Sequence, residues 1–359
     1  MLELIKDKKF IVMLGTGGVG KTTCSIALAI MAARHGRKVG LLSIDPAKRL
    51  ASALGLPLGH EPKEIIFETE LEFAGSLKAC MLDQKEIFDA MVRKFTKDPR
   101  TCQNILNNQI YKAISTKFGG ATEYMALAKT QEMLESLDYD LVILDTPPDT
   151  QALDFLQRPN VLENFHENKV IPWLIKPFHI ADKLGVTKLF NVSERLMGGV
   201  AKIAGLQALK MISEFLILVQ NVINGFHLAG QQVSASLKAP ATAFILVSSV
   251  TYSSKKSALL LSRNLSEMGF NLSGIIANKI LPKALEQEIN SNPENFSELA
   301  QLTDLFLQKR SAQLDLCQEL AKEIEIFSHQ MPKVFTIEEQ PYSLFEKKGI
   351  FQFSYAFGT

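Results

Sequence analysis

The chain has 359 residues, 47% of them hydrophobic, and its 39 basic and 38 acidic side chains leave a net charge of +1. This balance argues against a nucleic-acid binder, because such domains carry a basic excess or a basic stripe. No uninterrupted apolar run approaches the roughly 18 residues of a membrane helix, and the N-terminal segment lacks the apolar core of a signal peptide. These features predict a cytoplasmic protein with a large core and without a stable membrane anchor.

Apolar segments of strand length alternate along the chain with segments of helical periodicity. This alternation predicts a parallel sheet with helices on both faces, so the expected fold class is α/β with a doubly wound, mostly parallel sheet. The expected strands span residues 10–14, 38–45, 77–82, 139–145, 241–250, 272–280 and 333–337. The expected helices span residues 21–34, 47–55, 84–95, 101–118, 122–137, 254–268 and 297–328.

Residues 154–239 break this alternation, because they lack a good strand signal and show helical spacing instead. Apolar side chains between Leu196 and Val219 recur with a period near 3.6 residues. We interpret 154–239 as an α-helical subdomain inserted into a single domain that covers residues 1–359. Its apolar stripes fit a packed core better than a client-binding surface.

A glycine-rich segment directly follows the first expected strand. Residues 15–23 read Gly-Thr-Gly-Gly-Val-Gly-Lys-Thr-Thr, which fits the phosphate-binding pattern of a glycine, four free positions and then Gly-Lys-[Ser/Thr]. Glycines let the backbone wrap closely around an oxyanion, and its N–H groups then point inward at the start of a helix. We expect Lys21 to reach the β- and γ-phosphates and the Thr22 hydroxyl to bind Mg²⁺. The expected nucleotide-binding residues are Gly15, Gly17, Gly18, Val19, Gly20, Lys21, Thr22 and Thr23.

Two of the expected strands end on an aspartate. Asp145 fits the acid that holds Mg²⁺ directly or through water, with a cap for the next turn as the alternative. Asp45 ends the second strand, and the carboxyl ends of parallel strands line the ligand crevice in such folds. Asp45 is therefore the candidate catalytic residue, together with Lys21, and would orient or deprotonate the attacking water. The alternative for Asp45 is a structural Asp-Pro turn.

Three sequence blocks, in this order, resemble a known family. They are the loop at 15–23, Ser-Ile-Asp-Pro-Ala at 43–47 and Asp-Thr-Pro-Pro at 145–148. Together they are similar to the arsenite-efflux and tail-anchored-protein-targeting ATPases, which belong to the P-loop ATPases with a deviant Walker A motif. The resemblance extends from residue 10 to about residue 280. Three further blocks look more like a bacterial branch often labelled anion-transporting ATPase, at 108–111, 123–126 and 152–156.

The resemblance implies a P-loop topology and roles for particular residues. Asp45 would lie in the first switch segment and activate water, and residues 145–153 would form the second switch segment. Asn278 matches the asparagine with which the family contacts adenine, and an amide can meet both a donor and an acceptor on that base. The implied cofactors are ATP and Mg²⁺. The implied partners are a second ATPase subunit, as a homodimer or as a heterodimer with a paralogue, and a protein client.

Two features of the nucleotide site depart from the family pattern. Members with the full deviant motif carry a lysine that reaches the phosphates of the facing subunit, whereas this chain has Thr16. A lysine-bearing paralogue or the nearby cations Lys48 and Arg49 could supply the missing charge, and we favour the paralogue. The second switch segment reads Asp149–Gln151 where many relatives have Gly-His.

The cysteines depart from the pattern as well. Cys24, Cys80, Cys102 and Cys317 are far apart, and no two form a C-x-x-C pair. This spacing favours isolated buried thiols over a disulfide framework or a zinc site. It also differs from the zinc clasp of the tail-anchored branch and from the clustered thiols with which the arsenite branch binds metalloid. We therefore expect no metalloid ligand.

Three functions follow in order of preference. The first is a cytoplasmic, Mg²⁺-dependent ATPase that acts as a dimeric, nucleotide-driven switch on a protein partner and turns over slowly until a partner completes its site. The second is a catalytically weak regulatory subunit that pairs with a lysine-bearing paralogue. The third is a membrane-positioning partner ATPase. It ranks lower because such proteins often end in a basic amphipathic helix, whereas residues 347–359 alternate apolar and polar side chains like a strand.

Overall fold

The computed structural model describes residues 1–45, 47–67, 74–82, 84–109, 111–112, 115, 121–148, 152, 156, 215, 228, 231–342, 344 and 347–357. The chain divides into two compact units. The first comprises Met1–Leu82, Lys129–Gln157 and Ser234–Thr359, and the second comprises Asp83–Ala128 and Arg158–Val233. Most of the helical insertion expected at 154–239 lies outside the described residues, so its content remains a prediction.

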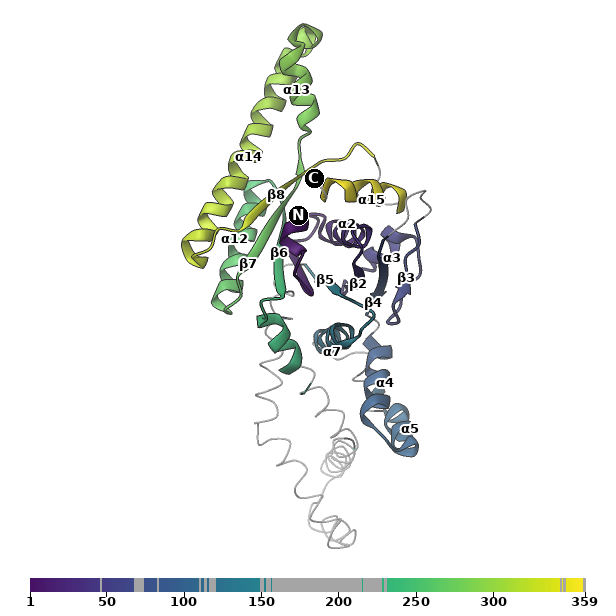
Figure 1. Ribbon diagram of the computed structural model, residues 1–359. Helices are drawn as coiled ribbons and strands as arrows, with labels where there is room; N and C mark the ends of the chain where they lie inside the picture. Colours follow the sequence, from purple (N-terminus) through teal and green to yellow (C-terminus); the bar gives the residue numbers. More distant parts are fainter. Residues whose placement is uncertain are drawn as a thin grey trace, which may run out of the picture. The chain divides into compact units, whose positions relative to one another are not determined.

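The first unit is built on an eight-stranded sheet with the order β3-β4-β2-β5-β1-β6-β7-β8 (Figure 1). Every strand pair is parallel except β3 with β4. This confirms the expected α/β fold with a mostly parallel sheet. The central strand β1 is buried at all six positions, as its continuous apolar sequence requires. The strands are β1 (Phe10–Gly15), β2 (Lys38–Ser43), β3 (Lys63–Glu64), β4 (Ser76–Met81), β5 (Leu141–Asp145), β6 (Thr242–Ser249), β7 (Leu272–Ile280) and β8 (Lys333–Glu338).

Helices pack on different parts of this sheet. Helix α2 contacts β1, β2, β4 and β5, whereas α12 contacts β6 and β7, and α14 contacts α12, β7 and β8. No described helix is both long enough and apolar enough to cross a membrane. The helices of this unit include α1 (Leu2–Ile5), α2 (Lys21–Arg34), α3 (Arg49–Leu54), α12 (Tyr252–Glu267), α13 (Lys283–Ser291), η1 (Pro293–Leu299), α14 (Ala300–Ser328), α15 (Lys347–Phe353) and η2 (Ser354–Phe357).

The second unit contributes α4 (Gln84–Phe95), α5 (Pro99–Asn107) and the first part of α7 (Ala121–Glu135). Helix α5 begins where Asp98 caps it, since its carboxylate accepts a hydrogen bond from the backbone N–H of Thr101 at 2.8 Å. The single helix expected at 101–118 is wrong in its extent. The described helix ends at Asn107, because Asn108 adopts an extended conformation with φ −63° and ψ 136°.

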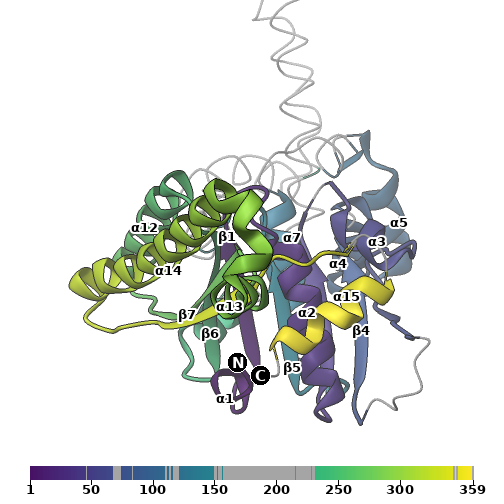
Figure 2. The same cartoon turned by 90° about the horizontal axis from the view of Figure 1, so that it is seen from above.

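Helix α2 is buried almost all round, and this fixes the position of its first turn. Residues 26–33 are each at most 1% exposed. The sheet covers one side of the helix, and α15 with η2 covers another; Figure 2 shows α15 lying across α2. A helix that is apolar on all sides is stable only inside a core. The first turn of α2, which carries Lys21 and Thr22, is therefore attached to a rigid element.

The C-terminal segment is helical, whereas its sequence pattern predicts a strand. Residues 347–359 were expected to alternate like a strand, but the described part forms the helices α15 and η2. Ile350, Phe353 and Phe357 recur at helical spacing, and each is at most 1% exposed. Their burial holds the segment on α2. The guanidinium group of Arg34 adds a cation–π contact, with its Cζ atom 3.7 Å from the centre of the Tyr355 ring. A short run of apolar and polar residues can fit both the two-residue period of a strand and the 3.6-residue period of a helix. In this segment, packing on α2 favours the helix.

Candidate functional site

The phosphate loop connects β1 to α2, in the position that the motif predicts. Gly18 and Gly20 have φ values of 79° and 91°, and Gly20 is the residue at which α2 begins. A side chain at Gly20 would collide with the amide nitrogen of Asn278, and one at Gly15 would collide with the carbonyl oxygen of Val247. Glycine is therefore required at Gly15 by the close approach of the Val247 backbone, and it is favoured at Gly20 by the positive φ. The backbone N–H groups at the start of a helix can bind an anion, which is the role that the motif predicts for the start of α2.

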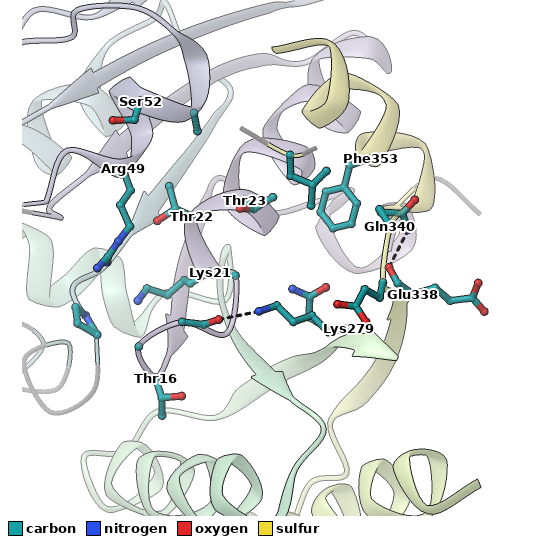
Figure 3. A pocket seen from close by; sticks show the side chains of 18 of the residues that line it. Thr16, Lys21, Thr22, Thr23, Arg49, Ser52, Lys279, Glu338, Gln340 and Phe353 are labelled. Atoms are coloured by element: carbon teal, nitrogen blue, oxygen red, sulfur yellow. Dashed lines mark hydrogen bonds between the residues drawn. The ribbon is translucent and has the colours of Figure 1, made fainter. Parts of the chain in front are cut away.

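A cleft of about 580 Å³ opens above this loop, and all of its lining residues belong to the first unit. Lys21 is 7% exposed and donates a hydrogen bond to the Gly15 carbonyl at 3.4 Å. Figure 3 shows Lys21, Thr16, Thr22 and Arg49 around the loop. The lining residues are Thr16, Gly17, Gly18, Gly20, Lys21, Thr22, Thr23, Arg49, Ser52, Ala53, Pro148, Asn278, Lys279, Glu338, Glu339, Gln340, Tyr342, Leu344 and Phe353.

Asp145 lies fully buried at the end of β5, and three hydroxyl groups donate hydrogen bonds to its carboxylate. Its carboxylate accepts hydrogen bonds from Thr22 at 2.8 Å, from Ser43 at 2.9 Å and from Ser25 at 3.3 Å. Burial raises the pKa of Asp145, while the charge of Lys21 and the hydroxyl groups of Thr22 and Ser43 oppose that rise. Sequence reasoning missed Ser25 and Ser43, although two serines at otherwise apolar positions of a helix and a strand were an available signal.

The pair of Thr22 and Asp145 suits a magnesium ion. Mg²⁺ prefers hard oxygen ligands and is held by one or two protein groups together with substrate phosphates. A hydroxyl and a carboxylate at 2.8 Å provide such oxygens beside the loop. A buried carboxylate is also stabilised by a nearby cation. The described residues contain no group of three or more His, Cys, Asp or Glu side chains that could hold a metal by themselves.

Asp45 follows β2 and is 5% exposed. Its carboxylate accepts a hydrogen bond from the Ala47 N–H at 3.0 Å and pairs with Arg49 at 3.1 Å. The first bond is that of an Asx turn, so the structure gives Asp45 the turn role that was weighed as the alternative. The role of Asp45 in activating water remains a prediction. Of the expected second switch segment, residues 149–151 and 153 lie outside the described part of the chain.

The cations near Thr16 differ in position. Thr16 is half-buried on the wall of the cleft, and Arg49 lines the same cleft. Lys48 is exposed and does not belong to the described lining of the cleft. It precedes α3 with a left-handed backbone, φ 54°. Of the two cations named as possible substitutes for the missing lysine, the structure therefore places Arg49 at the site.

Asn278 lies near the end of β7, as expected, and is 6% exposed. Its amide nitrogen donates a hydrogen bond to the Val19 carbonyl at 2.9 Å. An amide nitrogen carries two hydrogens, so this bond leaves one for a nucleotide base. The contact of Asn278 with adenine remains a prediction. The next residue, Lys279, was missed by sequence reasoning and also contacts the loop, with Nζ 3.1 Å from the Gly18 carbonyl oxygen (Figure 3).

The buried cysteines have the properties of core residues. Cys24, Cys80 and Cys317 are each at most 6% exposed and lie in α2, β4 and α14. Burial raises the pKa of Cys80 to about 12 and that of Cys317 to about 11. Burial, assisted by the charge of Asp145, also raises the pKa of Cys24. Soft metalloids bind converging thiolates, and these thiols remain protonated at neutral pH.

Arsenite and antimonite are expected to leave ATP turnover unchanged, since the buried thiols offer no thiolate. A turnover assay with and without each metalloid measures this. The control is a chain in which Cys24, Cys80, Cys102 and Cys317 are all replaced by alanine and whose fold is checked by circular dichroism. An increase in rate that depends on metalloid and disappears in the cysteine-free chain would contradict the prediction.

The central parallel sheet, the loop between its buried strand and α2, and the acid on the neighbouring strand are the architecture of the P-loop nucleoside triphosphatases. Comparison with known proteins narrows this class. A sequence model of the family described as anion-transporting ATPase matches residues 8–333. The chain therefore belongs to the anion-transporting ATPase family, a family of ATP hydrolases, and the resemblance seen in the three sequence blocks is confirmed.

Curated relatives carry the names of ATPases. ATPase get3 of Aspergillus terreus is 32% identical over 159 residues, which cover 44% of this chain and 45% of that protein. ATPase ASNA1 homolog 1 of Paramecium tetraurelia is 31% identical over 159 residues, which cover 43% of this chain and 45% of that protein. ATPase GET3 of Malassezia globosa is 31% identical over 163 residues, 44% of each chain. The chain thus spans less than half the length of these relatives.

Proposed function

We propose that this protein is a cytoplasmic, Mg²⁺-dependent ATP hydrolase that acts as a dimeric, nucleotide-driven switch on a protein partner. The observation that carries the proposal is the 2.8 Å contact between Thr22, at the start of α2, and Asp145, at the end of β5. It brings the metal-binding hydroxyl of the phosphate loop and the metal-organising acid to one point. Family membership supports the choice of ATP as the nucleotide.

Each part of the site has a distinct role in this proposal. The loop N–H groups and Lys21 bind the phosphates, and Thr22 and Asp145 would hold Mg²⁺, which when bound neutralises charge on the phosphate chain. Asp45 orients the attacking water. The first turn of α2, which carries Lys21 and Thr22, is held in place because α2 is buried in the core. A change of nucleotide state is therefore expected to act through the segments after β2 and β5, which begin at Asp45 and Asp145.

A regulatory subunit is the second candidate, and Thr16 is the observation that favours it. Thr16 lies on the wall of the cleft and, unlike a lysine, would bring no positive charge to the phosphates of a facing subunit. Such a subunit would bind ATP and turn it over only with a lysine-bearing paralogue. Turnover measured with and without that paralogue separates the two candidates.

A membrane-positioning ATPase remains the third candidate function, because the apolar side chains of the C-terminal helix are buried. The C-terminal segment does form a helix, with Lys347 and Lys348 at its start, as such ATPases often have. Its apolar side chains Ile350 and Phe353 are nevertheless buried against the core. They are not available to enter a lipid surface while the helix is docked on α2.

Lys21→Ala is expected to weaken binding of Mg²⁺–ATP by about tenfold or more, since a charge-assisted hydrogen bond contributes roughly 1.5–3 kcal/mol. Titration calorimetry measures the affinity. The matched control is Lys256→Ala, which removes an exposed lysine from α12. Thermal unfolding of both variants shows whether the loss of Lys21 beside the buried Asp145 has altered the fold. Equal ATP affinity in Lys21→Ala and wild type would contradict the proposed function.

A further inference from the structure

The Asn278–Lys279 pair contacts two consecutive carbonyl groups of the phosphate loop. The Asn278 amide donates to the Val19 carbonyl at 2.9 Å, and the Lys279 ammonium donates to the Gly18 carbonyl at 3.1 Å. Both residues come from the end of β7, which is far from the loop in sequence. Two donors on two successive peptide groups link the loop to the sheet, through a buried bond from Asn278 and an exposed bond from Lys279.

A regular strand cannot place these two side chains together, because successive side chains point to opposite faces of a sheet. Lys279 is a left-handed residue with φ 64°. The pairing of β7 with β8 shifts register between Asn278 and Ile280, as at a β-bulge. A bulge re-aims a side chain, and this one brings the Lys279 ammonium to the same loop that Asn278 contacts.

Buried residues of α14 hold the bulge in this conformation. Gln313 donates to the Lys279 carbonyl at 3.3 Å and accepts from the Leu281 N–H at 2.9 Å. Arg310 donates to the Leu281 carbonyl and pairs with Glu286 at 2.7 Å. Gln313 is 9% exposed and Arg310 is 5% exposed. An unusual backbone conformation persists only where its surroundings fix it, and these contacts do so.

The contacts have a geometric consequence for anion binding. A trans peptide group is planar, so its N–H points away from its own carbonyl. The Gly18 carbonyl shares a peptide group with the Val19 N–H, and the Val19 carbonyl shares one with the Gly20 N–H. Drawing both carbonyls toward β7 turns both N–H groups the other way. A phosphate-binding nest needs successive N–H groups that point to one place.

We propose that Asn278 and Lys279 are positioning residues that hold the Gly18 and Val19 carbonyls and so keep the phosphate loop in its anion-binding form. This inference rests on the proposed nucleotide-binding function and adds to it two residues that orient the loop. Lys279 also places a positive charge on the wall of the cleft. This charge comes from the same chain as the phosphate loop, in which Thr16 stands where the family pattern has a lysine.

The test is the affinity of full-length variants for inorganic pyrophosphate and for Mg²⁺–ADP by titration calorimetry. Lys279→Met keeps the side-chain stem and removes the donor, and it is expected to weaken the binding of both ligands by about threefold to tenfold. Lys279→Arg keeps a donor and is expected to restore most of the affinity. Lys256→Met, which changes the net charge equally at an exposed site on α12, is the matched control and should bind as wild type.

A second variant separates positioning from stability. Lys279→Gly adopts a positive φ without strain, so its melting temperature should equal or exceed that of wild type while its pyrophosphate affinity falls as in Lys279→Met. Unchanged pyrophosphate affinity in Lys279→Met and Lys279→Gly would overturn the inference and leave the proposed function intact. A wild-type chain that bound neither ATP nor pyrophosphate would instead contradict the proposed function itself.

Discussion

Asp45→Asn is expected to lose most ATP turnover while its affinity for ATP stays close to that of wild type. The amide keeps the size of the side chain and can still accept the hydrogen bond that Asp45 receives from the Ala47 N–H at 3.0 Å. It cannot take a proton from water. General-base catalysis contributes about 10²–10⁴-fold, so the rate should fall by about that factor. An effect on turnover without an effect on binding marks a group that acts in the reaction step.

Steady-state turnover and calorimetric ATP affinity, measured on the same preparation, test this expectation. The control is Asp304→Asn, which makes the same chemical change at an exposed position of α14. Asp45 also forms an ion pair with Arg49 at 3.1 Å, which Asp45→Asn would weaken, so the effect of losing this pair must be measured separately. Arg49→Gln releases this partner and shows whether the pairing alone alters the rate. Wild-type turnover in Asp45→Asn would mean that Asp45 serves only the turn after β2.

The parts of the site that follow from the sequence are those encoded by neighbouring residues. The phosphate loop is one continuous segment, and its chemistry depends on residue types at fixed spacing. Asp145 could be predicted because an acid at the end of an apolar strand lies at the ligand edge of a parallel sheet. The alternation of strands and helices likewise predicted the parallel sheet, since each element could be recognised within its own segment.

The parts that sequence reasoning missed depend on contacts between distant segments. Lys279 reaches the loop only because a bulge turns it, and that bulge is held by Gln313 from α14. No local pattern around Lys279 encodes this. The far wall of the cleft carries no motif: Glu338 lies there because β8 pairs with β7, and Phe353 because α15 packs on α2. The same packing overrides the strand-like alternation of the C-terminal segment.

Thr16→Lys is expected to raise the ATPase rate of the protein alone, by supplying the charge that the family resemblance implies at this position, where it would reach the phosphates of a facing subunit. Thr16 lies on the cleft wall at the start of the phosphate loop, so a lysine there starts from the position in the motif that the family uses. Cations supplied in trans contribute about 10³–10⁵-fold in other P-loop enzymes, so even an imperfectly placed one should produce a clear increase. Multiple-turnover assays over a range of protein concentrations measure it, because a charge supplied by a facing subunit acts only in the dimer.

Arg49 and Lys48 provide the matched comparison. Arg49 lines the cleft and pairs with Asp45, whereas Lys48 is exposed and lies outside the described lining. If a paralogue supplies the missing charge, Thr16→Lys raises the rate and Arg49→Ala lowers it only modestly. If Arg49 is the source, Thr16→Lys changes little, Arg49→Ala abolishes turnover and Lys48→Ala has no effect. The second result would refute the need for a paralogue, because the chain would then carry its own cation beside the phosphates, four residues after Asp45.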